Sequence, residues 1–379
     1  IGTVSHGAKS WLLIGGFSIQ PAEFSKVATA LALAKWCSRH NFNIKKMKEL
    51  AIALLIIFFP AGLIILQNDT GSALVFVSFM LVLYREGLSG NLLLLGGLVA
   101  VLFILSLIFP VDGIFLTLYV LAIIGFWLLQ RRRKHVFVLL LLSAGLMAAS
   151  YIAFRALGRP FNLALAVTGT ASVPILIGFF RASWYKEKHL YALLFPLIIA
   201  FMFTASVDYF FNEILSEHQR TRINVLLGLQ EDIHGAGYNV YQSKIAIGSG
   251  GFTGKGFLRG TQTKLDFVPE QSTDFIFCTV GEEWGFIGTT LVIVAFITLL
   301  IRLITLAERQ KLHFARAYGY GVVAVMLFHF AVNIGMTIGI APVIGIPLPF
   351  FSYGGSSLWG FTLLLFIMLR LDASRTAFL

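Results

Sequence analysis

The chain has 379 residues, of which 58% are hydrophobic and only 12% are charged, and its mean hydropathy is +0.85. Soluble domains are roughly one quarter charged, so this chain has too few charges to cover a surface that faces water. A net charge of +11 would suit a nucleic-acid partner in a soluble protein. No basic face here carries the stacking aromatic residues of a nucleic-acid module, so nucleic acid is excluded and membrane lipids are expected instead.

Eleven apolar runs are candidates for membrane-spanning helices, which need about 20 residues, or fewer where neighbouring helices shield the ends. They comprise residues 23–38, 50–67, 71–84, 91–109, 113–130, 135–154, 161–180, 190–211, 284–306, 317–340 and 356–369. The first and third runs are short. The pattern predicts an all-α fold, a polytopic helical bundle integral to the membrane.

The positive charges orient this bundle. When alternate loops are placed in the cytoplasm, those loops hold seventeen Lys and Arg residues and the opposite loops hold nine. Short cytoplasmic loops of membrane proteins carry an excess of Lys and Arg. Six of the nine lie in one long loop, residues 212–283, where this rule weakens. We therefore expect the long loop to lie outside the cytoplasm.

Residues 212–283 form the one large hydrophilic segment, and loops longer than about 15 residues are usually functional or disordered. Apolar and aromatic residues occur throughout this segment, whereas a disordered segment would lack them. Its glycine-rich stretch, residues 248–260, lacks the GxxxxGK[ST] pattern of a phosphate-binding loop. We interpret the segment as a folded extracytoplasmic loop that carries the chemistry.

Ionisable residues beside or within spanning helices are functional candidates, because their desolvation is costly. Glu23 and Lys26 are three residues apart at an outer helix end and therefore share a face. A local ion pair with an N-terminal cap is the structural alternative. Asp69 lies in a hairpin between two helices, where we favour the interpretation of a helix N-cap.

Asp274 stands beside three apolar residues, shortly before the helix expected from residue 284. Such surroundings can perturb the proton affinity of a carboxylate, which suits catalysis, and helix capping is the alternative. The same loop carries cations that include Arg220, Arg222 and Lys244. Guanidinium and ammonium groups bind phosphate oxygens, so these cations suit a lipid-linked phosphate, or the headgroups of ordinary lipids.

Residues 341–357, with the sequence APVIGIPLPFFSYGGSS, contain three prolines and a glycine pair that preclude a regular helix. Such backbone is tolerated at membrane depth only where it is buried in protein or lines a cavity. Asn333 precedes this stretch within a helix. We expect a re-entrant segment that supports a substrate groove.

Motifs along the chain resemble those of the SEDS family, whose members act in shape, elongation, division and sporulation. They are Gly7-Ala8-Lys9-Ser10-Trp11, Gln20-Pro21-Ala22-Glu23-Phe24-Ser25-Lys26, Asn68-Asp69-Thr70-Gly71, His218-Gln219-Arg220-Thr221-Arg222, GAGYNVYQSKIAIGSGG at 235–251, Thr273-Asp274-Phe275-Ile276-Phe277, Gly281-Glu282-Glu283 and PLPFFSYGGS at 347–356. A match of this length and order is very specific.

The resemblance implies a peptidoglycan glycosyltransferase that polymerises lipid II into glycan strands at the outer face of the bacterial cytoplasmic membrane. It also implies a class B penicillin-binding protein as the partner that supplies the transpeptidase. The stretch at residues 260–262 and the loop after it favour the RodA branch, which serves cell elongation and shape, over the branch that serves cell division.

The sequence departs from the family pattern in two respects, within a single membrane domain over residues 1–379. The family places three helices before its first motif, whereas this chain begins at Ile1 without a Met. We therefore expect N-terminal helices to be missing. Residues 91–180 are interpreted as an extra four-helix insertion to which the resemblance assigns no role.

The family's reaction suggests roles for the polar residues. Because the donor sugar of lipid II is α-linked and the polymer is β-linked, the acceptor's 4-hydroxyl is expected to displace pyrophosphate directly, with Asp274 as general base. The expected contacts of the pyrophosphate are Lys26, Arg220, Lys244 and Arg222. Trp11 and Glu23 are expected to shape the groove, with structural roles as the alternative. No cofactor is expected beyond a divalent cation, magnesium or manganese, that would share the phosphate charge.

Two other functions compete with polymerisation. A lipid II flippase would also have many helices, charges within the membrane and a broken segment. Transporters, however, often bind substrate near the midplane between internal repeats, and no repeat is evident here. A non-catalytic scaffold that activates a class B penicillin-binding protein is the third interpretation.

Overall fold

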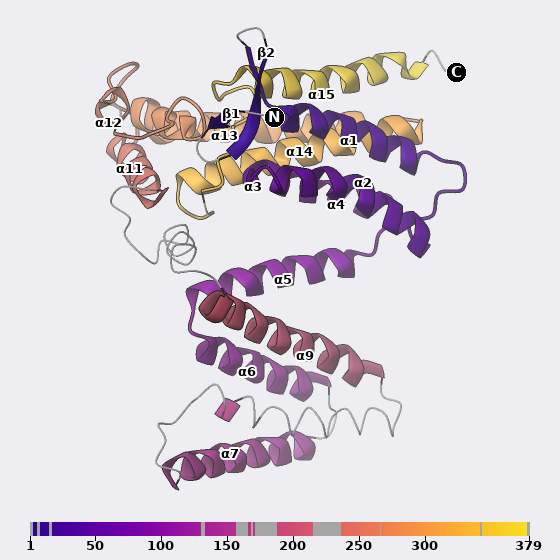
Figure 1. Ribbon diagram of the computed structural model, residues 1–379, viewed down its shortest axis with the longest axis vertical. Helices are drawn as coiled ribbons and strands as arrows, with labels where there is room; N and C mark the ends of the chain where they lie inside the picture. Colours follow the sequence, from indigo (N-terminus) through magenta and orange to yellow (C-terminus); the bar gives the residue numbers. More distant parts are fainter. Residues whose placement is uncertain are drawn as a thin grey trace. The chain divides into compact units, whose positions relative to one another are not determined.

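A computed structural model describes residues 3–5, 8–14, 17–129, 133–156, 166–167, 170, 188–214, 236–265, 267–341 and 343–376. The chain divides into two compact units. The first comprises Ile1–Leu93 and Glu231–Leu379, and the second comprises Leu94–Gln230. Figure 1 shows that each unit is built mainly of helices. The candidate site residues that are described all belong to the first unit.

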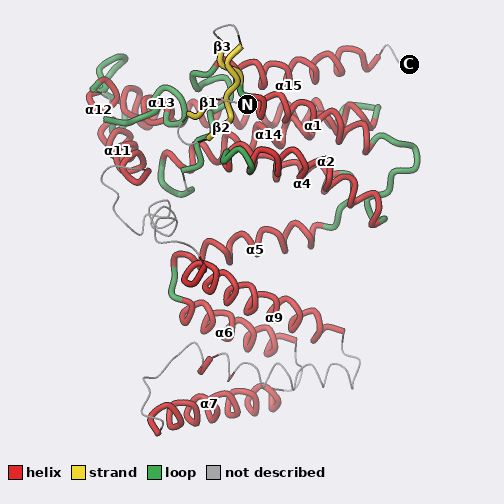
Figure 2. The backbone as a smooth tube through the Cα atoms, viewed as in Figure 1, coloured by secondary structure: helices red, strands yellow, loops and turns green. Residues whose placement is uncertain are grey.

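The first unit begins with a small antiparallel sheet, drawn in yellow in Figure 2, and continues in helices. The sheet consists of β1 (Thr3–Ser5), β2 (Ala8–Ile14) and β3 (Phe17–Ile19). The helices before the second unit are α1 (Pro21–Cys37), α2 (Met47–Ile65), α3 (Thr70–Val75), the 3₁₀ turn η1 (Phe76–Phe79) and α4 (Met80–Arg85). Those after it are α11 (Ala236–Ser249), α12 (Thr261–Lys264), α13 (Ile276–Glu308), α14 (His313–Thr337), α15 (Gly355–Ala373) and η3 (Ser374–Thr376).

The second unit is entered along α5 (Gly90–Ile108), whose first residues belong to the first unit. It continues with α6 (Val111–Leu129), α7 (Arg133–Ala156), α9 (Lys188–Tyr209) and the π-helical turn η2 (Phe210–Ile214). α6 packs against α9, with the rings of Phe115 and Phe201 5.2 Å apart. The run expected at residues 161–180 lies almost wholly outside the described residues, and the interpretation of 91–180 as an insertion stays a prediction.

The helices confirm an all-α, multi-pass membrane protein. Within the described residues, six helices are long and apolar enough to span a membrane. They are Met47–Ile65, Val111–Leu128, Leu194–Glu213, Ile276–Glu308, His313–Thr337 and Gly355–Ala373. Large apolar side chains on their surfaces are exposed, such as Phe59 on α2 and Leu291 on α13. Such exposure is stable where the surrounding solvent is hydrocarbon.

Two helices differ from the runs expected from the sequence. The run at 71–84 is interrupted by the 3₁₀ turn η1, between α3 and α4. α13 starts at Ile276 and is kinked at Gly285, so its part after the kink corresponds to the run expected from residue 284, and a helical segment precedes that run. Between α14 and α15, the described part of residues 338–354 contains no helix or strand, as the prolines predict. We call residues 338–354 the broken segment.

α14 is the central helix of the first unit. It contacts α1, α4, α13 and α15, and 56% of its apolar window is buried, against 22% for that of α13. Its Tyr318 is wholly buried and donates a hydrogen bond of 3.1 Å to the carbonyl oxygen of Leu364 on α15. The polar side chains on the buried face of this helix can contact only other protein segments, and this property determines the site.

The glycine-rich stretch packs its backbone against the start of α13. Gly285 has φ 62° and ψ −154° inside α13, a conformation that favours glycine. The helix is kinked at this residue, and the Phe286 amide donates to the Gly251 carbonyl at 2.9 Å. A Cβ on Gly250 would lie 1.9 Å from the Gly281 carbonyl oxygen. The glycines therefore allow two backbones to approach, a structural role that needs no nucleotide.

This close approach predicts that Gly250→Ala destabilises the protein. The new Cβ would overlap the Gly281 carbonyl, so the two backbones must separate, at a cost of about 1–3 kcal/mol in the free energy of unfolding. Gly248→Ala is the matched control, because no atom lies within 4 Å of a Cβ there. Thermal unfolding in detergent should show a lower Tm for Gly250→Ala only. Equal Tm values for the two variants would contradict the packing described.

Candidate functional site

Three polar residues form a buried stripe along α14. His329, Asn333 and Thr337 follow one another at intervals of four residues, so they lie one turn apart on the same face. Each is at most 1% exposed. Buried polar groups are costly unless they are hydrogen-bonded. His329 and Asn333 meet this requirement by bonding to α1, to the broken segment and to the residue before the N-cap of α13. The Thr337 hydroxyl donates within α14 to the Ile334 carbonyl, and the Thr337 backbone carbonyl accepts from Ser243 of α11.

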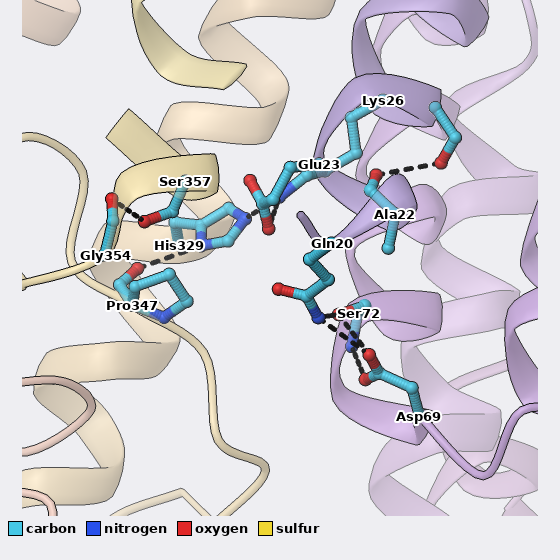
Figure 3. A network of polar contacts seen from close by, with 11 residues as sticks. Gln20, Ala22, Glu23, Lys26, Asp69, Ser72, His329, Pro347, Gly354 and Ser357 are labelled. Carbon is cyan, nitrogen blue, oxygen red and sulfur yellow. Dashed lines mark hydrogen bonds and ion pairs between the residues drawn. The ribbon is translucent and has the colours of Figure 1, made fainter. Parts of the chain in front are cut away.

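His329 joins α1 to the broken segment (Figure 3). Its Nδ1 lies 2.9 Å from the carbonyl oxygen of Pro347, and its Nε2 lies 3.0 Å from Nζ of Lys26. A carbonyl oxygen only accepts and an ammonium only donates. His329 is therefore neutral, with its proton on Nδ1 and with Nε2 accepting from Lys26.

Glu23 and Lys26 form the ion pair that their spacing predicts, with 2.8 Å between Glu23 Oε1 and Lys26 Nζ. The two residues are 2% and 1% exposed. The ammonium also lies 5.2 Å from the centroid of the Phe361 ring, which adds a cation–π interaction. The other carboxylate oxygen, Glu23 Oε2, is buried and has no hydrogen-bond partner among the residues that the structure describes. The predicted N-terminal cap is not made by a side chain, since the N-cap residue Gln20 forms no such bond.

The burial of Lys26 bears on its expected contact with pyrophosphate. In this conformation the ammonium is directed at Glu23 and His329, both within the protein. α15 closes over the pair at Gly360, where a Cβ would lie 3.2 Å from Glu23 Oε2. A phosphate could reach Lys26 only by replacing one of these partners, so the contact stays a prediction.

Asp69 caps α3, as the sequence predicts. Its Oδ1 accepts from the Ser72 amide at 3.0 Å, and its Oδ2 accepts from Ser72 Oγ and from Gln20 Nε2, both at 2.9 Å (Figure 3). The cap thereby ties the start of α1 to the start of α3. Gly71 then brings α3 against the broken segment, because a Cβ there would lie 1.9 Å from the carbonyl oxygen of Ile344.

Asp274 is half-buried, immediately before the N-cap residue of α13. The side-chain amide of Asn333 donates to the backbone carbonyl of Asp274 and to that of Ile346, both at 2.8 Å. The carboxylate lies against the broken segment at Gly345, where a Cβ would be 3.3 Å from Asp274 Oδ2. The structure thus connects Asp274 through α14 to the Glu23–Lys26 pair.

Lys244 is exposed on α11, next to Ser243, whose hydroxyl donates to the Thr337 carbonyl at 2.9 Å. Its ammonium lies beside Gly339, where a Cβ would be 2.6 Å from Nζ. The same stripe therefore holds the helix that carries this cation. Trp11 is half-buried in β2, opposite Thr3 of β1, and β2 contacts α1.

Arg220 and Arg222 lie outside the described residues, so their expected role stays a prediction. Among the residues that are described, no group of three or more His, Cys, Asp or Glu side chains could hold a metal ion.

Glu282 is a structural residue that the sequence analysis did not single out. Its buried carboxylate accepts from the backbone amides of residues 261, 262 and 263 at 2.7–2.9 Å and from the Lys255 ammonium at 2.7 Å. These bonds hold the segment at residues 255–263 against α13. A carboxylate within an otherwise apolar helix was the signal that could have identified it.

The model of the FtsW/RodA/SpoVE family, described as a cell cycle protein, matches residues 1–138 and 168–377. The peptidoglycan glycosyltransferase RodA of Treponema pallidum is 32% identical over 94% of this chain and 75% of its own length. The peptidoglycan glycosyltransferase MrdB of Escherichia coli is 31% identical over 94% of this chain and 69% of its own length. The family match includes residues 91–138 and 168–180 of the stretch interpreted as an insertion.

A solved structure shares the fold. It comes from a peptidoglycan synthase complex that coordinates polymerization and crosslinking. The TM-score is 0.58 with 24% sequence identity, and the match covers 99% of this chain and 76% of the other.

The buried ion pair predicts a strongly non-additive double-mutant cycle. Lys26→Met leaves the Glu23 carboxylate buried without its counter-charge, and Glu23→Gln leaves the Lys26 ammonium buried without its counter-charge. Either change should lower the free energy of unfolding by about 3–5 kcal/mol. The double variant removes both charges and should recover most of the lost free energy of unfolding. Thermal or denaturant unfolding in detergent measures all four proteins. Additive losses would show that the two charges do not depend on each other.

Proposed function

The chain belongs to the FtsW/RodA/SpoVE family, and from this premise we propose that it is a peptidoglycan glycosyltransferase that polymerises lipid II for cell elongation. Relatives that carry this activity in their names match 94% of the chain at 31–32% identity. The observation that carries the proposal is the placement of Asp274. Its half-buried carboxylate lies at the broken segment and is connected by α14 to the helix that presents Lys244.

The chemistry needs a base. Converting an α-linked donor into a β-linked polymer inverts one carbon, so the acceptor's 4-hydroxyl attacks that carbon and pyrophosphate leaves from the opposite side. A new C–O bond forms, the bond to pyrophosphate breaks, and the hydroxyl proton passes to the Asp274 carboxylate. A positioned carboxylate contributes about 10²–10⁴-fold to such a step.

The leaving pyrophosphate gains negative charge, which cations stabilise. We assign the first contact to Lys244, because this residue is exposed on α11. Lys26 acts from its buried position beside Glu23 and contacts phosphate only if it exchanges a partner. Arg220 and Arg222 complete the proposed set, and a magnesium or manganese ion held by the phosphates would share the charge. Trp11 and Glu23 are proposed to line the groove.

The reaction is assigned to the outer face of the bacterial cytoplasmic membrane, because the Lys and Arg distribution places residues 212–283 outside. The proposed partner is a class B penicillin-binding protein that crosslinks the strands. Support comes from the fold, which is shared with a synthase complex that combines polymerization with crosslinking.

Asp274→Asn should reduce glycan polymerisation by about 10²–10⁴-fold, because the amide cannot accept the hydroxyl proton. The assay supplies labelled lipid II and a divalent cation to the purified complex with a class B penicillin-binding protein whose transpeptidase is inactivated. Glycan polymer is then read on a gel. Glu270→Gln is the matched control, since it removes an exposed carboxylate from the same loop.

Polymer from Asp274→Asn at the wild-type rate would remove this residue from the mechanism. Absence of polymer from the folded wild-type complex would instead favour a lipid II flippase or a scaffold. For the flippase, the specific observation is the ion pair buried among membrane helices, which transporters use in substrate pathways.

Lys244→Gln should lower kcat/KM for lipid II about tenfold or more. A hydrogen bond to a charged group contributes about 1.5–3 kcal/mol, and each 1.4 kcal/mol is about a factor of ten. Lys264→Gln, at an exposed lysine of the same loop, serves as the control. Equal losses in the two variants would indicate a general effect of positive charge rather than a contact made by Lys244.

A further inference from the structure

Asn333 connects the proposed base to the broken segment. One amide group donates two hydrogen bonds, to the Asp274 carbonyl and to the Ile346 carbonyl, each of 2.8 Å. We propose that Asn333 is a positioning residue that fixes Asp274 for proton abstraction by holding these two backbones together. This inference rests on the proposed function, because it gives Asn333 a role only through Asp274.

The two carbonyls belong to segments that form neither helix nor strand. Ile346 lies in the broken segment, between Gly345, whose φ is +64°, and Pro347. Asp274 precedes the N-cap residue of α13, Phe275, which makes no side-chain cap bond. Asn333, by contrast, is wholly buried on the central helix of the unit. A side chain from a rigid element therefore defines the position of two irregular backbones.

The broken segment meets Asp274 at its side chain as well. A Cβ on Gly345 would lie 3.3 Å from Asp274 Oδ2, so the carboxylate rests against this backbone. Two residues before Asp274, the Ser272 carbonyl accepts from the Tyr353 amide of the broken segment at 2.9 Å. Loss of the Asn333 bonds would let the two segments separate and would move the carboxylate relative to a bound hydroxyl. A displacement of about 1 Å can reduce a rate about 10²-fold.

The chemistry of the amide group makes this role testable. An amide supplies the two N–H donors that two carbonyls require, whereas a carboxylate of the same shape supplies none. Within the described part of the chain, the buried Asn333 oxygen Oδ1 has no hydrogen-bond partner, and the group acts as a donor through its two N–H bonds. Asn333→Asp thus removes both bonds with little change of volume. Asn333→Gln keeps both donors on a longer side chain.

The experiment measures kcat and KM for lipid II, together with Tm, in the complex with the penicillin-binding protein. We expect kcat of Asn333→Asp to fall about 10²-fold, with KM within about twofold of wild type because the phosphate contacts are elsewhere. Asn333→Gln should recover part of the loss in kcat. Thr337→Val is the matched control, a wholly buried residue of the same stripe whose hydroxyl bonds only within α14.

Each other outcome overturns the proposal. A kcat near the wild-type value in folded Asn333→Asp would show that the two bonds do not position the base. If Asn333→Asp does not fold, the Asn333→Gln variant tests the proposal instead. A fall in its Tm that parallels its loss of activity would show that Asn333 is a structural residue only. Asp274→Asn is measured beside them. If that variant polymerises lipid II normally, it is the proposed function that fails, whatever the Asn333 variants do.

Discussion

A lysine ammonium buried among membrane helices must keep its hydrogen-bond partners, and the first unit is organised around this constraint. Lys26 is 1% exposed, and its ammonium has the Glu23 carboxylate and the His329 ring as partners. Removing one member of such a pair leaves an uncompensated charge. His329 in turn uses its remaining nitrogen to hold Pro347, so the position of the ion pair and that of the broken segment depend on each other.

The same solution is repeated along α14. Prolines and irregular backbone leave carbonyl groups unpaired, and at membrane depth there is no water to bond them. His329 bonds the carbonyl of Pro347, and Asn333, one turn later, bonds the carbonyl of the preceding residue, Ile346. Asn333 extends the network to Asp274, and the Thr337 carbonyl extends it to α11. A satisfied polar stripe thereby places the proposed base and the cation-bearing helix on one rigid support.

Local rules of sequence predicted the features whose causes are local. The Glu23–Lys26 pair follows from a three-residue spacing, the Asp69 cap from the hairpin that contains it, and the broken segment from its prolines. The partner of His329 lies 303 residues away, and no periodicity links them. The role of Glu282 was not predicted either, because its partners, which include the Thr263 amide, belong to a loop that folds back onto α13. The exposure of a side chain also depends on residues that are distant in the sequence, so the burial of Lys26 was not predicted.

The most direct test of this account is a cryo-electron microscopy structure of the complex with a non-hydrolysable lipid II analogue in the donor and acceptor positions. The account predicts that the acceptor's 4-hydroxyl lies within hydrogen-bond distance of the Asp274 carboxylate. It also predicts that the donor's pyrophosphate contacts Lys244, while the Asn333 bonds to the Asp274 and Ile346 carbonyls persist. An analogue bound near the membrane midplane, or one whose sugars lie away from Asp274, would contradict it.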